Sequence, residues 1–183
     1  MKAFLLSLLV THFVGIGGLY ADDTPAASQP QSEQESELVK TTFLITGLHC
    51  PPCAQTVEES LRGIKGVQYA KLDWKTKNAH IEFDEHIISA QQLSERIAST
   101  AHMMGGDMKY SGWLALSVAD IKESDDASWN LLKEALGKLK GVKQVAVYNS
   151  KLAVGVRFDV KGELTSTELI AAMADNGFKL SNY

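Results

Sequence analysis

The apolar positions from residue 38 onward follow two periods, one typical of strands and one typical of amphipathic helices. In the first half, this pattern predicts strands at about 40–46, 68–74, 79–83 and 108–111, and helices at about 52–63 and 89–101. Lys75–Asn78 reads as the turn between two of these strands, and Ser89 as the start of the second helix. The predicted order is strand, helix, strand, strand, helix, strand.

The second half of the chain shows the same order of patterns. Strands are predicted at about 113–119, 143–148, 152–158 and 178–182, and helices at about 127–139 and 166–175. A shift of 75 residues aligns the apolar helix face, the turn and the hairpin of the two halves: Ala54, Val57, Leu61 and Ile64 fall on Trp129, Leu132, Leu136 and Leu139, and Lys65-Gly66-Val67 falls on Lys140-Gly141-Val142. The sequence therefore predicts an internal duplication.

Each half, at about 70 residues, has the pattern of a split βαβ unit. The predicted fold is therefore α+β, with two tandem ferredoxin-like βαββαβ units, 38–111 and 112–183. Each unit is expected to form a four-stranded antiparallel sheet with two helices on one face. Because few residues separate the halves near Ser111–Trp113, the two sheets are expected to be closely coupled, in the tightest case through one nearly continuous strand.

Residues 1–21 are predicted to be a signal peptide. Lys2 gives a basic start, Ala3–Leu19 is apolar, and Ala21 precedes a polar stretch. Residues 22–37 contain no large apolar side chain and are predicted to be a disordered acidic linker. We therefore expect an exported protein, periplasmic or secreted. The alternative is an uncleaved membrane anchor, the one case in which a membrane would be a partner.

The composition narrows the classes of function. A net charge of −4 and 45% apolar residues suit a globular protein and do not suit a nucleic-acid binder. No nucleophile–base pair and no phosphate-binding loop is recognisable in the sequence, so the chain is not expected to be an enzyme. His80, His86 and the three tryptophans are assigned to surface positions and to packing.

Cys50 and Cys53 are the only two cysteines, and they stand between the first predicted strand and the first predicted helix. The partial positive charge at a helix N-terminus favours thiolates, which bind soft metals or attack disulfides. Cysteine ligands select Cu(I) and related soft ions, whereas two cysteines alone do not make a closed tetrahedral zinc site. In the second half, Asp125 and Ser128 occupy the corresponding positions.

The stretch Gly47-Leu48-His49-Cys50-Pro51-Pro52-Cys53 resembles the motif Gly-Met-x-Cys-x-x-Cys of the heavy-metal-associated domain family. That family includes copper chaperones, modules of copper-transporting ATPases and the periplasmic mercury-binding protein. The resemblance covers about 38–111, and 113–183 resembles a copy without the motif. It implies metal binding at Cys50 and Cys53, with Cu(I) as the first candidate and Hg(II) or Zn(II) as others. It also implies a membrane metal transporter or another metal-binding domain as partner.

Two details of the motif depart from the family pattern. Leu48 is expected to take the buried place of the usual Met, a change that conserves volume. Pro51 and Pro52 remove two N–H donors and restrict Cys50 and Pro51 to extended conformations, so the helix is expected to begin at Pro52 after a stiff loop.

Other soft donors lie near the motif or in the loop that follows the second helix. His49, Met103 and Met104 are candidate auxiliary ligands, because imidazole and thioether groups suit Cu(I). The competing interpretation is that His49 is a surface residue and that the methionines are packing or surface residues.

Three other roles for the cysteines are open. Cys-Pro-Pro-Cys also resembles a thioredoxin-type motif, although the four prolines, Pro25, Pro30, Pro51 and Pro52, leave none downstream to form that family's cis-proline strand. The pair could also form an inert disulfide, which closes too short a loop to stabilise the fold much. Finally, the protein could be an interaction adaptor with vestigial cysteines.

Overall fold

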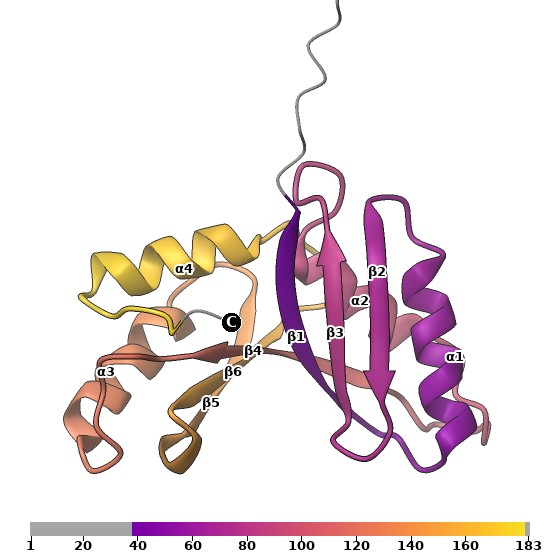
Figure 1. The fold of residues 1–183 in the computed structure, drawn as a ribbon, viewed down its shortest axis with the longest axis horizontal. Helices are drawn as coiled ribbons and strands as arrows, with labels where there is room; N and C mark the ends of the chain where they lie inside the picture. Colours follow the sequence, from indigo (N-terminus) through magenta and orange to yellow (C-terminus); the bar gives the residue numbers. More distant parts are fainter. Residues whose placement is uncertain (1–37, 182–183) are drawn as a thin grey trace, which may run out of the picture. The chain divides into compact units, whose positions relative to one another are not determined.

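The computed structural model describes residues 38–181, and its strands form one antiparallel sheet in the order β2-β3-β1-β4-β6-β5 (Figure 1). The strands are β1 (Val39–Thr46), β2 (Val67–Asp73), β3 (Asn78–Phe83), β4 (Ser111–Ser117), β5 (Val142–Tyr148) and β6 (Ala153–Phe158). The helices are α1 (Pro51–Arg62), α2 (Ala90–Ser99), α3 (Asp126–Gly137) and α4 (Ser166–Asp175), and a short 3-10 turn, Asn149–Lys151, joins β5 to β6. The predicted α+β class and the four predicted helices are confirmed.

One face of this sheet carries the core. Residues paired directly across neighbouring strands point to the same face, and Phe43 pairs with Leu114, which pairs with Val156. All three side chains are buried in the same cluster as the apolar faces of α1, α2, α3 and α4. The helices therefore cover one face of the sheet, and the alternate residues of the strands lie on the other face.

β4 is shared by the two halves, which corrects the prediction of two four-stranded sheets. It pairs with β1 through Ser111–Ala115 and with β6 through Leu114–Ser117, so six strands form a single sheet. The sequence pattern predicts separate strands at 108–111 and 113–119. From Gly112 to Val118 every second residue is buried without interruption, so there is no turn at which one strand could end and another begin.

The strand predicted at 178–182 is reduced to an isolated bridge between Val118 and Leu180. The Ala119 amide donates to the Lys179 carbonyl at 2.9 Å, and the Ser181 amide to the Ser117 carbonyl at 3.1 Å. β1 already occupies the neighbouring edge of β4 up to Ala115, so little of that edge remains for a C-terminal strand.

Equivalent backbone contacts occur 75 residues apart. Gly66 and Gly141 have φ values of 96° and 100°, a region that glycine adopts without steric cost. The Asp84 amide donates to the Gly66 carbonyl at 2.9 Å, and the Asp159 amide to the Gly141 carbonyl at 2.8 Å. The shift that aligns the sequences therefore also aligns these turns.

Side chains of the first half bind the backbone of the second. Both Glu85 carboxylate oxygens accept hydrogen bonds at the start of α4, from the backbone N–H and hydroxyl groups of Ser166 and Thr167. The Gln91 side chain donates to the Asp159 carbonyl at 3.1 Å and accepts from the Leu164 amide at 3.1 Å. Helix N-termini favour anionic partners, so Glu85 acts as a cap supplied from the other half.

We expect Glu85→Gln to lower the free energy of unfolding by about 2 kcal/mol, because charge-assisted hydrogen bonds to the α4 terminus are lost. Glu82→Gln is the matched control: its exposed pairing with Lys40 should contribute less than about 1 kcal/mol. Urea unfolding measures both values. Equal effects of the two variants would contradict the capping role.

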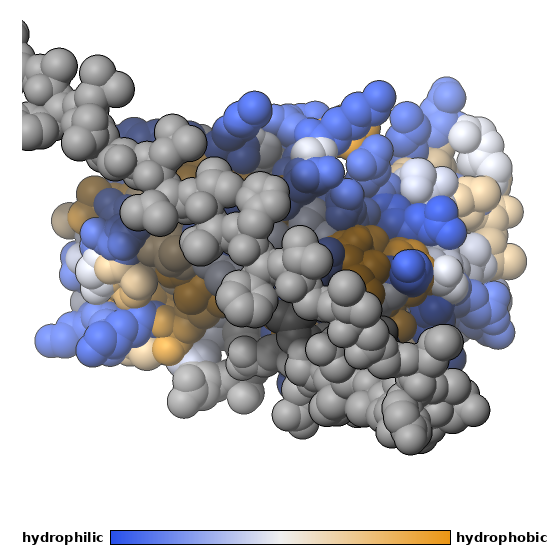
Figure 2. Space-filling view, turned by 90° about the horizontal axis from the view of Figure 1, so that it is seen from above, coloured by the Kyte–Doolittle hydropathy of each residue, from blue (hydrophilic) through white to orange (hydrophobic). Residues whose placement is uncertain are grey.

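The signal peptide predicted at 1–21 and the linker predicted at 22–37 lie outside the described residues. Between residues 38 and 181, no helix has both the length and the apolar character needed to cross a membrane. Figure 2 looks onto the end of the sheet opposite the cysteines, where the surface is mainly hydrophilic with apolar patches between.

Candidate functional site

The two cysteines meet at the N-terminus of α1, where they form a disulfide with a Cα–Cα distance of 5.2 Å. Cys50 is the N-cap, in an extended conformation, and its Sγ accepts a hydrogen bond from the Cys53 amide at 3.3 Å. Cys53 is fully buried, whereas Cys50 is partly exposed. Cys53 therefore belongs to the core, and Cys50, in the same helical turn, is partly buried at its edge.

The helix begins at Pro51, one residue earlier than predicted. Pro51 and Pro52 occupy its first two positions, so Pro51 is helical and not extended. Proline fits here because its fixed φ suits a helix and because the first-turn amides have no partner within the helix. Of those amides, the one at Cys53 remains to donate to the Cys50 sulfur.

The loop before the cysteines is held by a buried side chain and by a close backbone contact. Leu48 is buried, as predicted. Gly47 has a φ of 86°, and a Cβ there would collide with the carbonyl oxygen of Lys109. The cysteine loop therefore packs tightly against the residues that lead into β4.

The predicted auxiliary ligands lie at this same end of the sheet. The His49 ring is 5.6 Å from the ring of His102, and the His102 Nε2 lies 3.0 Å from the Gly47 carbonyl oxygen. Met103 and Met104 follow His102 and are exposed. The loop between α2 and β4 and the cysteine loop are thus joined, as the topology predicts.

Lys77 contacts the cysteine loop, a contact that the sequence does not predict. It lies in the turn between β2 and β3, and its ammonium donates to the Leu48 carbonyl at 3.4 Å. Its φ of 60° is unusual for a residue with a side chain. Lysine in a turn is so common that only the folded arrangement distinguishes this one.

We expect Lys77→Gln to weaken binding of a soft cation to the reduced cysteines by less than about tenfold, because a positive charge that contacts the cysteine loop at Leu48 is lost. Lys75→Gln removes a charge from the same turn and should change the affinity less. A competition titration at low and high salt compares the two variants. Identical behaviour would exclude an electrostatic role for Lys77.

In the second half, α3 has an N-cap at the position equivalent to that of α1, but the residues there are Asp125 and Ser128 instead of cysteines. Asp125 is the N-cap of α3 and accepts from the Ser128 amide at 3.1 Å, as Cys50 accepts from Cys53. The Ser128 hydroxyl, and then its amide, donate to this carboxylate and hold the pKa of Asp125 below its usual value. The two sites thus correspond in position, but the second carries no sulfur.

A family model named heavy-metal-associated domain matches residues 42–102, from within β1 to the first residues of the loop after α2. This segment contains the cysteine loop and the first turn of α1. Residues 42–102 form a heavy-metal-associated domain. The resemblance given by the motif is thereby confirmed for this part of the chain.

The curated relatives of the chain include copper-transporting ATPases. Copper-transporting ATPase HMA5 of Oryza sativa subsp. japonica is 26% identical over 159 residues, which are 82% of this chain and 15% of the relative. Copper-transporting ATPase 2 of Rattus norvegicus is 24% identical over 174 residues, 81% of this chain and 12% of the relative. The chain thus spans only a small part of these proteins.

Among solved structures, the water-soluble region of the P-type ATPase CopA from Bacillus subtilis is similar with a TM-score of 0.39 and 21% identity, over 80% of this chain and 91% of that one. Oxidized MerP from Ralstonia metallidurans CH34 has a TM-score of 0.35 and 23% identity, over 41% of this chain and 96% of that one. The heavy-metal-associated domain assignment rests on the family model and not on these scores.

Proposed function

We propose that this is an exported metal-binding protein, in which the heavy-metal-associated domain captures a soft ion through Cys50 and Cys53 and passes it on. The observation that carries the proposal is the meeting of both sulfurs at the N-terminus of α1, with Cys50 at the surface. A helix N-terminus stabilises thiolates, and thiolates bind soft ions. The partly exposed Cys50 gives an acceptor a place to begin ligand exchange.

The donor set favours an ion that accepts two ligands. Between residues 38 and 181, no group of three or more His, Cys, Asp or Glu residues is arranged to hold a metal ion. A closed zinc site needs four protein ligands, so Cu(I) is the first choice of cargo, with Hg(II) next and Zn(II) last. The relatives' names, copper-transporting ATPases, support the same choice.

The disulfide must open before the cysteines can bind. Two electrons and two protons convert the Cys50–Cys53 bond into two thiols, and a thiol or dithiol reductant can supply them. Binding of Cu⁺ to both sulfurs then releases two protons and leaves a complex with one negative charge. Binding of the ion by the two cysteines is therefore expected only when the protein is reduced.

The second half is proposed to be a duplicated copy that has lost metal binding and serves a structural or docking role. Its α3 cap, Asp125, and its turn at Gly141 support the duplication, since both correspond to first-half features 75 residues earlier. The proposed acceptor is a membrane metal transporter or another metal-binding domain. Export is proposed from the apolar stretch and small residue within 1–21.

A titration of two redox forms of the same protein tests this function. Anaerobic protein with two free thiols should bind one equivalent of Cu(I) tightly at the cysteines. Protein with the disulfide intact should lack this tight binding. If the reduced protein instead turns over insulin disulfides without metal and shows no tight Cu(I) binding, the pair is a redox site and the proposal is wrong.

A further inference from the structure

Three methionines of the α2–β4 loop are exposed, against the usual preference of this residue for the interior. Met103, Met104 and Met108 are 55%, 61% and 44% exposed. Met173, in α4, is fully buried and shows the ordinary behaviour. Three thioether side chains are therefore open to solvent within six residues of one loop.

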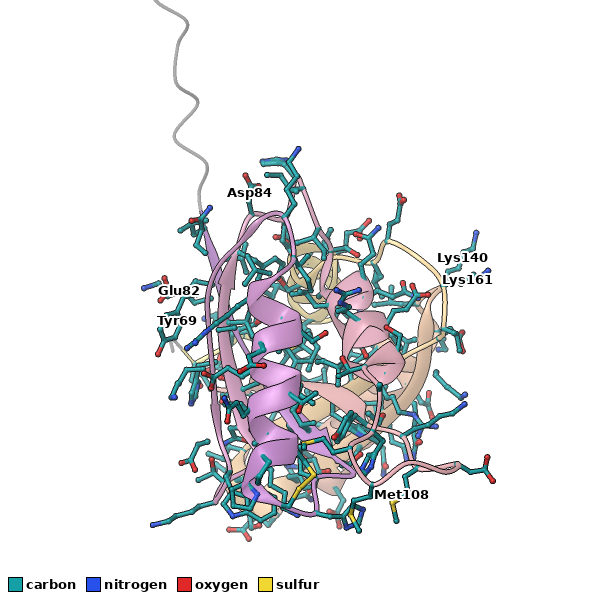
Figure 3. The ribbon with its side chains drawn as sticks, turned by 90° about the vertical axis from the view of Figure 1, so that its right-hand side faces the viewer. Tyr69, Glu82, Asp84, Met108, Lys140 and Lys161 are labelled. Atoms are coloured by element: carbon teal, nitrogen blue, oxygen red, sulfur yellow. A yellow bond between two sulfur atoms is a disulfide. The ribbon has the colours of Figure 1, made fainter. Side chains whose placement is uncertain are left out.

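These methionines lie beside the cysteine loop. Figure 3 shows Met108 at the same end of the ribbon as the disulfide, with Asp84 at the opposite end. The loop is fastened there by the His102 ring, whose Nε2 lies 3.0 Å from the Gly47 carbonyl oxygen. The three thioethers therefore belong to the surface that presents Cys50.

The loop can bring its thioethers together. A hydrogen bond of 3.0 Å from the Gly105 amide to the His102 carbonyl closes a turn whose two central residues are Met103 and Met104. Gly105 and Gly106 both have positive φ and have no atoms within 4 Å of an added Cβ, so open space surrounds this turn. A second turn, at Gly106 and Asp107, separates this one from Met108, so all three methionines lie in or next to the two turns of this loop.

His102 is itself not free to bind a metal here. Its Nδ1 accepts from the Met104 amide at 3.2 Å, and its Nε2 lies within hydrogen-bond distance of the Gly47 carbonyl. Both ring nitrogens are thus engaged in holding the loop. The soft donors that this loop leaves unengaged are the three sulfur atoms of the methionines.

We propose that Met103, Met104 and Met108 form a second soft-ion site, which binds Cu(I) or Ag(I) through thioethers while the Cys50–Cys53 disulfide is closed. Thioether ligands are neutral and select soft monovalent ions. Binding to them releases no proton and needs no reductant, unlike binding to the cysteines. The chain can therefore hold its cargo beside the cysteines before they are reduced. This inference rests on the proposed function only for the class of ion.

The test uses the full chain with its disulfide intact and Ag(I) as probe, since silver(I) is soft, monovalent and stable in air. With methyl-labelled methionine, we expect one equivalent of Ag(I) to shift the methyl signals of Met103, Met104 and Met108 and to leave that of Met173 unchanged. Shifts spread over the whole spectrum, or no shift at one equivalent, would contradict the site.

Variants then separate the site from general silver binding. Leucine conserves the volume of methionine, so Met103→Leu/Met104→Leu/Met108→Leu should fold normally and bind Ag(I) at least about tenfold more weakly. Met173→Leu is the matched control and should retain the affinity. Equal affinity of the triple variant and the control would overturn the proposal.

Two further arms keep this inference distinct from the proposed function. The double variant Cys50→Ser/Cys53→Ser should still bind Ag(I) at the methionines. The reduced triple-leucine variant should still bind Cu(I) at the cysteines. Failure of the first arm alone contradicts the thioether site, and failure of the second alone contradicts the cysteine site.

Discussion

Cys50→Ser is expected to lower the Cu(I) affinity of the reduced protein by at least about a thousandfold, or roughly 4 kcal/mol. One of two thiolates is replaced by a hydroxyl, which is a hard and neutral donor. The fold should survive, because serine is a favoured N-cap and position 50 is the N-cap of α1. Anaerobic competition with a chromophoric Cu(I) chelator measures the affinity.

This measurement is best made in the triple-leucine background, where the loop methionines make no contribution. Asp125→Ser is the matched control, because it changes the equivalent N-cap of α3 in the second half. Its Cu(I) affinity should equal that of the parent. Tight Cu(I) binding that persists in Cys50→Ser, or an equal loss of affinity in Asp125→Ser, would show that the cysteines are not the Cu(I) ligands.

Gly47→Ala is expected to destabilise the fold by about 3 kcal/mol. Its φ of 86° is unfavourable for alanine, and the new methyl group would collide with the Lys109 carbonyl. The cysteine loop and the residues before β4 would have to separate, which would also break the contact between His102 and the Gly47 carbonyl. Urea unfolding of the parent and the variant measures the loss.

Gly105→Ala separates the two causes of this loss. Gly105 has a φ of 70°, similar to that of Gly47, but nothing lies within 4 Å of its added Cβ. Its replacement should cost only about 1 kcal/mol, the penalty for the backbone conformation alone. If both variants lost the same stability, the close packing of the two loops would not matter to the fold.

Local patterns predicted much of the fold. Ser89 was expected to open α2, and it does so in a capping box with Gln92. The shift of 75 residues paired Cys50 with Asp125, and both are N-caps that accept from the amide three residues later. A helix cap depends on residues close to one another in the sequence, so it can be recognised from the sequence alone.

Features that depend on distant residues were not predictable in this way. The merging of two predicted strands into β4 requires β1 to pair with its first part, Ser111–Ala115, and β6 with its last part, Leu114–Ser117, from opposite sides. The approach of Lys77 to Leu48 and of His102 to Gly47 depends on the turns that carry them. The start of α1 at Pro51 was not predicted, because the fixed φ of a proline suits the loop before a helix as well as the first turn of the helix.

X-ray absorption at the copper edge tests the central claim most directly. The sample is the reduced triple-leucine variant with one equivalent of Cu(I), in which Cys50 and Cys53 are the thiol donors and the remaining methionines are the buried Met173 and Met1, which lies outside the described residues. We predict a first shell of two sulfur atoms and no nitrogen or oxygen. A shell of nitrogen or oxygen atoms, or an unchanged spectrum after Cys50→Ser, would contradict metal binding by the cysteine pair.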